Sequence, residues 1–150
     1  MSKQWNAAEV LALITRKSRP FQSLGLEMLE ARQGYLRLGM QVREEMLGAH
    51  ELCEGGPIFT LADLACAFAA ITRNEMAVTQ SAHVTFVSPA RSGERLVAEA
   101  TEISRTRKNG VYDVTVKSED GRLVALLRGQ CALLGTPIVT IPGAPELAGS

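Results

Sequence analysis

The stretch Glu54-Gly-Gly-Pro-Ile-Phe-Thr-Leu-Ala-Asp-Leu-Ala-Cys-Ala-Phe-Ala-Ala70 decides the fold of this chain. Proline is favoured at the first position of a helix, where its missing N–H leaves no hydrogen bond unmade. The stretch therefore predicts a helix that begins at Pro57, behind an N-cap at Gly56, and ends near Arg73. Because the residues after Pro57 are almost wholly apolar, we expect this helix to be buried.

Asp63 is the charged exception in this apolar helix. An aspartate is almost never fully buried without a partner. Its carboxylate could be structural, pairing with an arginine or capping a neighbouring loop, or it could be functional. Its place inside the predicted buried helix makes it the first candidate for a catalytic group.

Composition excludes several classes of function. The chain has 150 residues, which suits a single domain over 1–150, and its 16 basic and 16 acidic residues argue against a general grip on nucleic acid. No apolar run has the length of a membrane span, and the first ten residues lack a secretory signal. Cys53, Cys66 and Cys131 are widely spaced, which argues against a disulfide framework or a zinc site. We therefore expect a cytoplasmic protein without a metal or a membrane partner.

In the N-terminal helical segment at 1–20, Asn6 can cap a short helix that runs from Ala7 to about Arg16, and Pro20 ends it. Periodicity also predicts six strands around the central helix. The first two strands form a hairpin at Gln33-Gly34, and the last three form an antiparallel meander with turns at Asn109-Gly110 and Asp120-Gly121. An irregular tail is expected at 135–150. The expected strands are 24–32, 35–42, 77–88, 95–105, 111–118 and 123–134.

This order of elements lacks βαβ alternation, so it predicts an α+β domain with one antiparallel sheet against the central helix. A helix that is apolar all round must be covered on its other side as well. The sheet can curl around it, or a second subunit can close over it.

The segment Gly55-Gly-Pro-Ile-Phe-Thr-Leu-Ala-Asp63 resembles the H-G-G-x-x-x-x-L-x-D segment of hotdog-fold acyl-CoA thioesterases of the phenylacetate-degradation (PaaI-like) type. Residues 84–100 resemble the strand–Pro-Ala–Gly–strand segment of the same family, and the element order matches over about 24–134. The resemblance implies a hotdog fold, in which the sheet wraps around the helix. It also implies a homodimer or a dimer of dimers (a homotetramer), with active sites at the subunit interface.

The resemblance also assigns roles in the hydrolysis of an aromatic or fatty acyl-CoA to free acid and coenzyme A. Asp63 would be the nucleophile or the general base, and the backbone N–H of Gly56 or Gly55 in the other subunit would polarise the thioester carbonyl. A helix N-terminus suits that role, because its N–H groups are unpaired and carry partial positive charge. Thr79 matches a Ser or Thr that helps to place the attacking water in some relatives. No cofactor is implied beyond the coenzyme A of the substrate.

Three positions depart from the family pattern. The family histidine before the double glycine is Glu54 here, and an asparagine common several residues earlier matches Gly48. Pro57 follows the glycines and has no N–H to offer. His50, in the same loop, is a candidate substitute for the missing imidazole. Glu54 could face the substrate cleft, take part in proton transfer or be a solvated loop charge.

Two loops are candidates for contact with the rest of the substrate. The first holds the densest basic run of the chain, and basic residues near this turn bind coenzyme A phosphates in relatives. The second follows the long strand at 77–88, and its arginine could hold a phosphate with two hydrogen bonds. Either loop could equally be a solvated surface. The candidates are Arg105, Arg107 and Lys108 in the first loop and Ser88, Pro89 and Arg91 in the second.

Two other functions remain open on the same fold. A non-catalytic acyl-CoA binding or regulatory module would explain the loss of the family histidine and asparagine. A hotdog dehydratase or hydratase is a third hypothesis, but such enzymes pair a histidine with a carboxylate, and no histidine has a convincing place beside Asp63. The sequence leaves open the acyl group, the choice between nucleophile and base, and the choice between dimer and tetramer.

Overall fold

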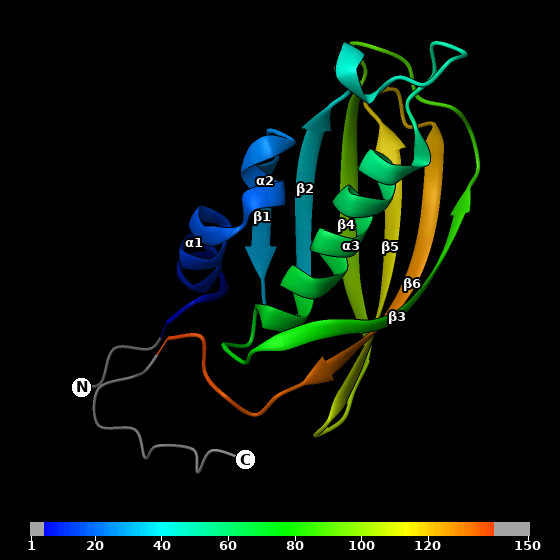
Figure 1. Ribbon diagram of the computed structural model, residues 1–150. Helices are drawn as coiled ribbons and strands as arrows, with labels where there is room; N and C mark the ends of the chain where they lie inside the picture. Colours follow the sequence, from blue (N-terminus) through cyan, green and yellow to red (C-terminus); the bar gives the residue numbers. More distant parts are fainter. Residues whose placement is uncertain (1–4, 140–150) are drawn as a thin grey trace.

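One antiparallel sheet curves around one long helix in the computed structural model, which describes residues 5–139 (Figure 1). The order of the strands is β1-β2-β4-β5-β6-β3, and neighbouring strands are antiparallel throughout. The predicted α+β class, the first hairpin and the final meander are confirmed. The strands are β1 (Glu27–Arg32), β2 (Tyr35–Gln41), β3 (Ala77–Phe86), β4 (Arg95–Arg105), β5 (Asn109–Ser118) and β6 (Leu123–Leu133).

The central helix is α3 (Gly55–Ile71), and it lies across the concave face of the sheet (Figure 1). It contacts every strand from β2 to β6. Two short helices, α1 (Ala7–Lys17) and α2 (Arg19–Ser23), lie beside β1, and a short 3-10 helix, η1 (Glu44–Met46), follows β2. Among residues 5–139, no helix is both long enough and apolar enough to span a membrane.

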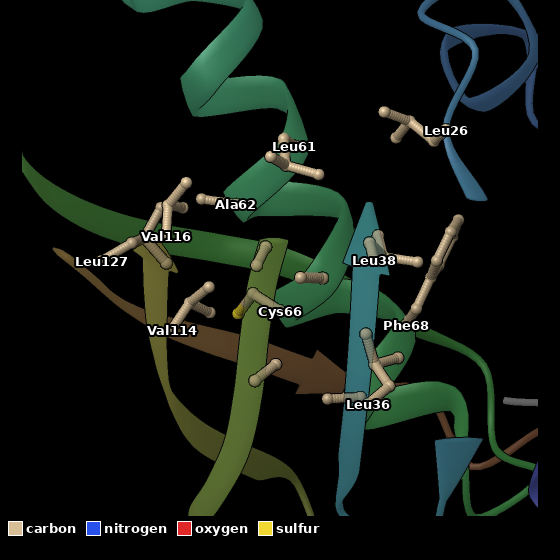
Figure 2. Packing of buried hydrophobic residues seen from close by; sticks show 14 of the residues in the cluster. Leu26, Leu36, Leu38, Leu61, Ala62, Cys66, Phe68, Val114, Val116 and Leu127 are labelled. Carbon is tan, nitrogen blue, oxygen red and sulfur yellow. The ribbon is translucent and has the colours of Figure 1, made fainter. Parts of the chain in front are cut away.

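Small residues let α3 lie close to the sheet. Ala62, Ala65 and Cys66 are fully buried on the helix. Gly129 of β6 faces Cys66, and a Cβ atom added there would lie 2.5 Å from Cys66 Sγ. Figure 2 shows Cys66 directed from the helix toward the strands. This close packing fixes the part of α3 that carries Asp63, one turn before Cys66.

The start of the central helix differs from the prediction. The N-cap is Glu54, with φ −63° and ψ 155°, and the first helical residue is Gly55, so the predicted N-cap at Gly56 is wrong. Pro57 is thus the third helical residue and not the first. Its missing N–H is still harmless there, because the N–H groups of the first turn have no partner within a helix.

The end of the central helix also differs from the prediction. The central helix ends at Ile71 rather than near Arg73, and Asn74 then takes a left-handed conformation (φ 59°) that no helix can continue through. The N-terminal helix confirms the predicted limits, since it runs from Ala7 to Lys17 behind an N-cap at Asn6. Pro20 is not what ends it, because Ser18 is already extended. Pro20 instead lies in the first turn of α2, whose N-cap side chain is contributed by Ser18.

The hairpin between β4 and β5 corrects a turn prediction. Asn109 and Gly110 lie inside β5, with Gly110 opposite Arg105, and the tip of the hairpin is Thr106–Lys108. Gly110 is needed for space, because a Cβ atom there would lie 2.6 Å from the ring of buried Tyr112. The turn at Asp120-Gly121 is confirmed, with Gly121 at φ +88°. The first strand begins at Glu27 rather than at residue 24, and residues 140–150 of the predicted tail lie outside the described range.

Candidate functional site

Asp63 has an unpaired oxygen inside the fold. Its side chain is half-buried on α3, and its Oδ1 atom is buried without a hydrogen-bond partner among residues 5–139. The structural alternatives, an arginine partner or a loop cap, would both require this carboxylate to accept a hydrogen bond from an N–H group, and Oδ1 accepts none from the described residues. A buried carboxylate oxygen that the fold leaves unsatisfied can accept a proton or attack an electrophile.

Two thiols lie next to Asp63. Cys66 on α3 is one turn further along, and its Sγ atom lies 3.8 Å from Sγ of Cys131 on β6. Contact with Cys131 and burial raise the pKa of the Cys66 thiol, and the negative charge of Asp63 adds to this rise. Cys66 is therefore a protonated, packed thiol at neutral pH and not a nucleophile.

Thr79 joins the same region from β3. It lies opposite Cys131 in the ladder between β3 and β6, and its buried hydroxyl has no nitrogen or oxygen partner within the described range. The chain of neighbours from Asp63 through Cys66 and Cys131 thus ends at Thr79. Asp63 on α3 and Thr79 on β3, both predicted as catalytic, therefore lie on either side of the Cys66–Cys131 contact, and the Thr79 hydroxyl interacts with the Cys131 thiol.

The N-terminus of α3 forms the second half of the candidate site. No side chain caps the helix among the described residues, and Gly55 and Gly56 hold the first N–H groups of the helix. A Cβ atom added to Gly56 would meet nothing within 4 Å, whereas one added to Gly55 would lie 2.9 Å from the Phe86 ring. Gly56 is open to an incoming group, and Gly55 is closed on one side by an aromatic wall.

A groove of about 400 Å³ opens beside this N-terminus. Two of its apolar walls, Phe86 and Val87, each have 49% of their surface exposed. The groove is lined by Cys53, Gly55, Ile58, Phe86, Val87, Ser88 and Pro89. An apolar groove beside free N–H groups can hold an apolar chain that ends in a carbonyl.

Sequence reasoning missed Ile58, Phe86 and Val87 as site residues. The available signal was the apolar pair at 86–87, which directly precedes Ser88-Pro89 in the predicted contact loop. Cys53 also lines the groove, but burial raises the pKa of its thiol and Glu54 adds to the rise, so this thiol too is protonated at neutral pH.

Of the remaining loop candidates, Ser88 and Pro89 line the groove, whereas Arg91 and His50 do not. Ser88 lines it, yet its hydroxyl donates to the Leu123 carbonyl at 2.6 Å and is therefore occupied. Pro89 is a wall residue, and Arg91 is exposed with no ion pair in the described part of the chain. His50 lies exposed at the tip of the loop before α3 and is not among the residues that line the groove.

The basic run lies at the other end of α3, away from the groove. Arg105 has ion pairs with Glu75 at 2.9 Å and with Glu102 at 3.6 Å, and it donates to the Ala70 carbonyl at 3.2 Å. Its charge is thus used inside the fold. Arg107 and Lys108, by contrast, are exposed at the hairpin tip and make no ion pair within residues 5–139.

One copy of the chain does not bring the two halves of the site together. Asp63 lies eight residues beyond Gly55 on the same helix, which is about 12 Å along the axis. A hydrogen bond spans about 3 Å. A carbonyl held at the N-terminus of α3 is therefore out of reach of Asp63 in the same chain. No cluster of three or more metal-ligating side chains occurs in the described range.

Comparison with known proteins gives the family. Residues 52–125 match the Thioesterase superfamily. The acyl-coenzyme A thioesterase PaaI of Escherichia coli is 32% identical over 117 residues, which cover 78% of this chain and 84% of that protein. The solved structure of the E. coli PaaI protein from the phenylacetic acid degradation operon aligns with a TM-score of 0.86 at 28% identity, over 87% of this chain and 95% of that one.

A structure of a PaaI variant from Thermus thermophilus aligns with a TM-score of 0.71 at 36% identity, over 74% of this chain and 95% of that one. These matches extend well beyond the segments quoted above and include the strands on both sides of α3. The resemblance that began with the double glycine and Asp63 is thereby confirmed. The chain belongs to the thioesterase superfamily, as a hotdog-fold acyl-CoA thioesterase of the PaaI-like type.

Proposed function

We propose that this protein hydrolyses acyl-CoA thioesters with an aromatic or fatty acyl group, and that Asp63 is the catalytic carboxylate. The main support for the proposal is the Oδ1 atom of Asp63, which is buried without a hydrogen-bond partner. Such an oxygen lowers the stability of the fold, so a catalytic role would explain its presence. The family relationship supports the substrate class: the E. coli relative is an acyl-coenzyme A thioesterase, and the solved structure of that same PaaI protein is described as coming from the phenylacetic acid degradation operon.

In the proposed reaction the thioester carbonyl accepts a hydrogen bond from the N–H of Gly56 or Gly55 at the start of α3. Asp63 takes the proton of a water that attacks the carbonyl carbon, and the developing oxyanion is held by the helix N-terminus. The carbon–sulfur bond then breaks, the proton held by Asp63 passes to the departing sulfur, and the free acid and the thiol of coenzyme A leave. Direct attack by Asp63, followed by hydrolysis of the anhydride, uses the same oxygen and the same oxyanion contact. Thr79 lies opposite Cys131, which contacts Cys66 one turn after Asp63, and this position supports a role for Thr79 in placing the attacking water.

We propose that a second copy of the chain completes each site. The separation of about 12 Å between Gly55 and Asp63 in one copy supports this, because the two groups must meet at one carbonyl. The edge strand β3 supports it as well: it is ten residues long, has no neighbour on its outer side among the described strands and carries exposed Val78 and Phe86. If two β3 strands pair in antiparallel fashion, the Thr79 end of one strand lies near the Phe86 end of the other.

The groove at Phe86 and Val87 is the proposed acyl subsite. Its apolar walls favour a hydrocarbon or aromatic group over a charged one. Arg107 and Lys108 are the proposed contacts for coenzyme A phosphates, and Arg91 is a second candidate. Arg105 fits this role less well, since its partners are Glu75 and Glu102. We further propose a reducing, cytoplasmic setting, which is supported by the three free thiols of the chain.

The test is thiol release from a panel of acyl-CoAs, such as acetyl-, decanoyl- and phenylacetyl-CoA, followed with a thiol reagent. The signal from the protein's own cysteines is measured without substrate and subtracted. The proposal expects release well above the uncatalysed rate for the decanoyl or phenylacetyl compound. Tight binding of these compounds by calorimetry without release would instead favour the acyl-CoA binding module. Size measurement across protein concentrations tests the second copy, and a monomer with full activity would exclude a shared site.

A further inference from the structure

Gly48 and Glu54 face each other across a narrow loop before α3. The N–H of Glu54 donates to the Met46 carbonyl at 2.8 Å, and Leu47 forms a bridge with Cys53. These contacts fold the Glu54 side chain back over residue 48. If Gly48 carried a Cβ atom, that atom would lie 2.8 Å from Cδ of Glu54, with a carboxylate oxygen closer still. The carboxyl group of Glu54 therefore fills the space that a side chain at position 48 would need.

Backbone conformation does not explain the glycine. The positive-φ glycines of the described chain are at 25, 34, 93, 121 and 135, and Gly48 is not among them. An alanine at position 48 is thus compatible with the backbone. Glycine is needed at position 48 because it has no side chain, and the Glu54 carboxylate occupies the space that a side chain would fill.

The place of this carboxylate matters because Glu54 is the N-cap of α3. Anions are attracted to a helix N-terminus, where the N–H groups are unpaired and the partial charge is positive. Nevertheless, the Glu54 side chain makes no hydrogen bond to the helix. Folded over Gly48, it leaves the N–H groups of Gly55 and Gly56 free for another acceptor.

We propose that Gly48 is a positioning residue for the thioester site, acting through Glu54. By giving the Glu54 carboxylate a place away from the helix, it keeps the chain's own anion from competing with the substrate carbonyl for the first N–H groups of α3. This inference rests on the proposed function. The inference also links the two departures from the family pattern at positions 48 and 54. A glutamate at 54 in this conformation leaves no space for a side chain at 48.

The test is Gly48→Ala in three backgrounds: wild type, Glu54→Ala and Glu54→Gln. In the wild-type background the displaced carboxylate moves onto the helix N-terminus, and KM for phenylacetyl-CoA rises about two- to fivefold, the range expected for an anion at a helix end. The turnover number changes little, since the competition is with substrate binding. In both Glu54 backgrounds Gly48→Ala leaves KM within about 1.5-fold of the parent, because no charge is displaced.

Gly39→Ala is the matched control. It adds the same methyl group in a strand remote from the groove, where the Cβ atom would lie 2.7 Å from the end of the Arg95 side chain and displace it. It is expected to leave KM unchanged. The dissociation constant of phenylacetyl-CoA is also measured by calorimetry for each of these variants combined with Asp63→Asn. This measurement does not depend on turnover.

The outcomes separate the two claims. A rise in KM or in the dissociation constant that is equally large in all three backgrounds, or no rise in any, overturns the positioning role while the proposed function stands. A rise that survives in Glu54→Gln also overturns it, because bulk rather than charge is then responsible. If the wild type releases no thiol, the proposed function fails, and the binding measurements in the Asp63→Asn background still decide the role of Gly48.

Discussion

Replacing Gly129 by alanine should destabilise the protein through one identifiable clash. The new Cβ atom would lie 2.5 Å from Cys66 Sγ, about 1 Å closer than ordinary van der Waals contact. Cys66 has little room to yield, because it is fully buried on α3 and its sulfur already touches Cys131 at 3.8 Å. Either β6 or the middle of α3 must move.

The size of the effect follows from known costs of overpacking. An extra methyl group in a well-packed core costs about 1–3 kcal/mol. For a chain of this length each kcal/mol lowers Tm by about 2–4 °C, so Gly129→Ala should melt about 2–12 °C below the wild type. Because Asp63 precedes Cys66 by one turn, a shift of the helix should also lower the turnover number.

The assay is urea denaturation followed by circular dichroism at one fixed protein concentration, with Cys66→Ala as the second arm. Removing the sulfur gives the new methyl group room, so Gly129→Ala in the Cys66→Ala background should cost less than about 0.5 kcal/mol. An equal cost of Gly129→Ala in both backgrounds would refute the clash. So would a variant whose free energy of unfolding in the wild-type background is unchanged.

Three further variants test other parts of the structure. Arg73 holds the pKa of Glu102 below its usual range, so the pair stabilises the fold above pH about 4.3 and this contribution is lost as pH falls through the lowered pKa. Glu102→Gln should therefore cost about 1–2 kcal/mol at pH 7 in urea denaturation, and a difference that does not shrink near pH 3 would contradict this. The double variant Arg107→Ala/Lys108→Ala should raise KM for acyl-CoA up to about fivefold but leave KM for the matching acyl-N-acetylcysteamine thioester unchanged. Phe86→Ala should lower kcat/KM for phenylacetyl-CoA about tenfold and that for acetyl-CoA much less, and equal losses for both would exclude Phe86 from the acyl subsite.

Much of the fold could be predicted from local patterns. The apolar run after Pro57 identified the central helix, and alternation with glycine turns identified the strands, because both signals are local in the chain. The turn at Asn109-Gly110 was misplaced for a reason that is not local. Gly110 serves the ring of Tyr112, and a glycine needed for packing looks the same in a sequence as one needed for a turn.

The candidate site was predictable to a similar degree. Asp63 stands out as a charge in an apolar helix, so the sequence alone draws attention to it. The contact of Cys66 with Cys131 joins residues 65 positions apart, and no spacing rule predicts it. The ion pairs of Arg105 were likewise hidden, because a basic run gives no sign of which member is neutralised inside the fold. The packing of Glu54 over Gly48 emerges only once the loop is folded.

The account depends most on Asp63, and one comparison tests it directly: thiol release by the wild type and by Asp63→Asn at saturating phenylacetyl-CoA. The substitution keeps the size of the side chain and removes its ability to accept a proton or to attack. We expect a loss of about 10²- to 10⁴-fold in the turnover number, with an unchanged circular dichroism spectrum and an unchanged dissociation constant for the substrate. An Asp63→Asn variant that turns over at the wild-type rate would contradict the central claim.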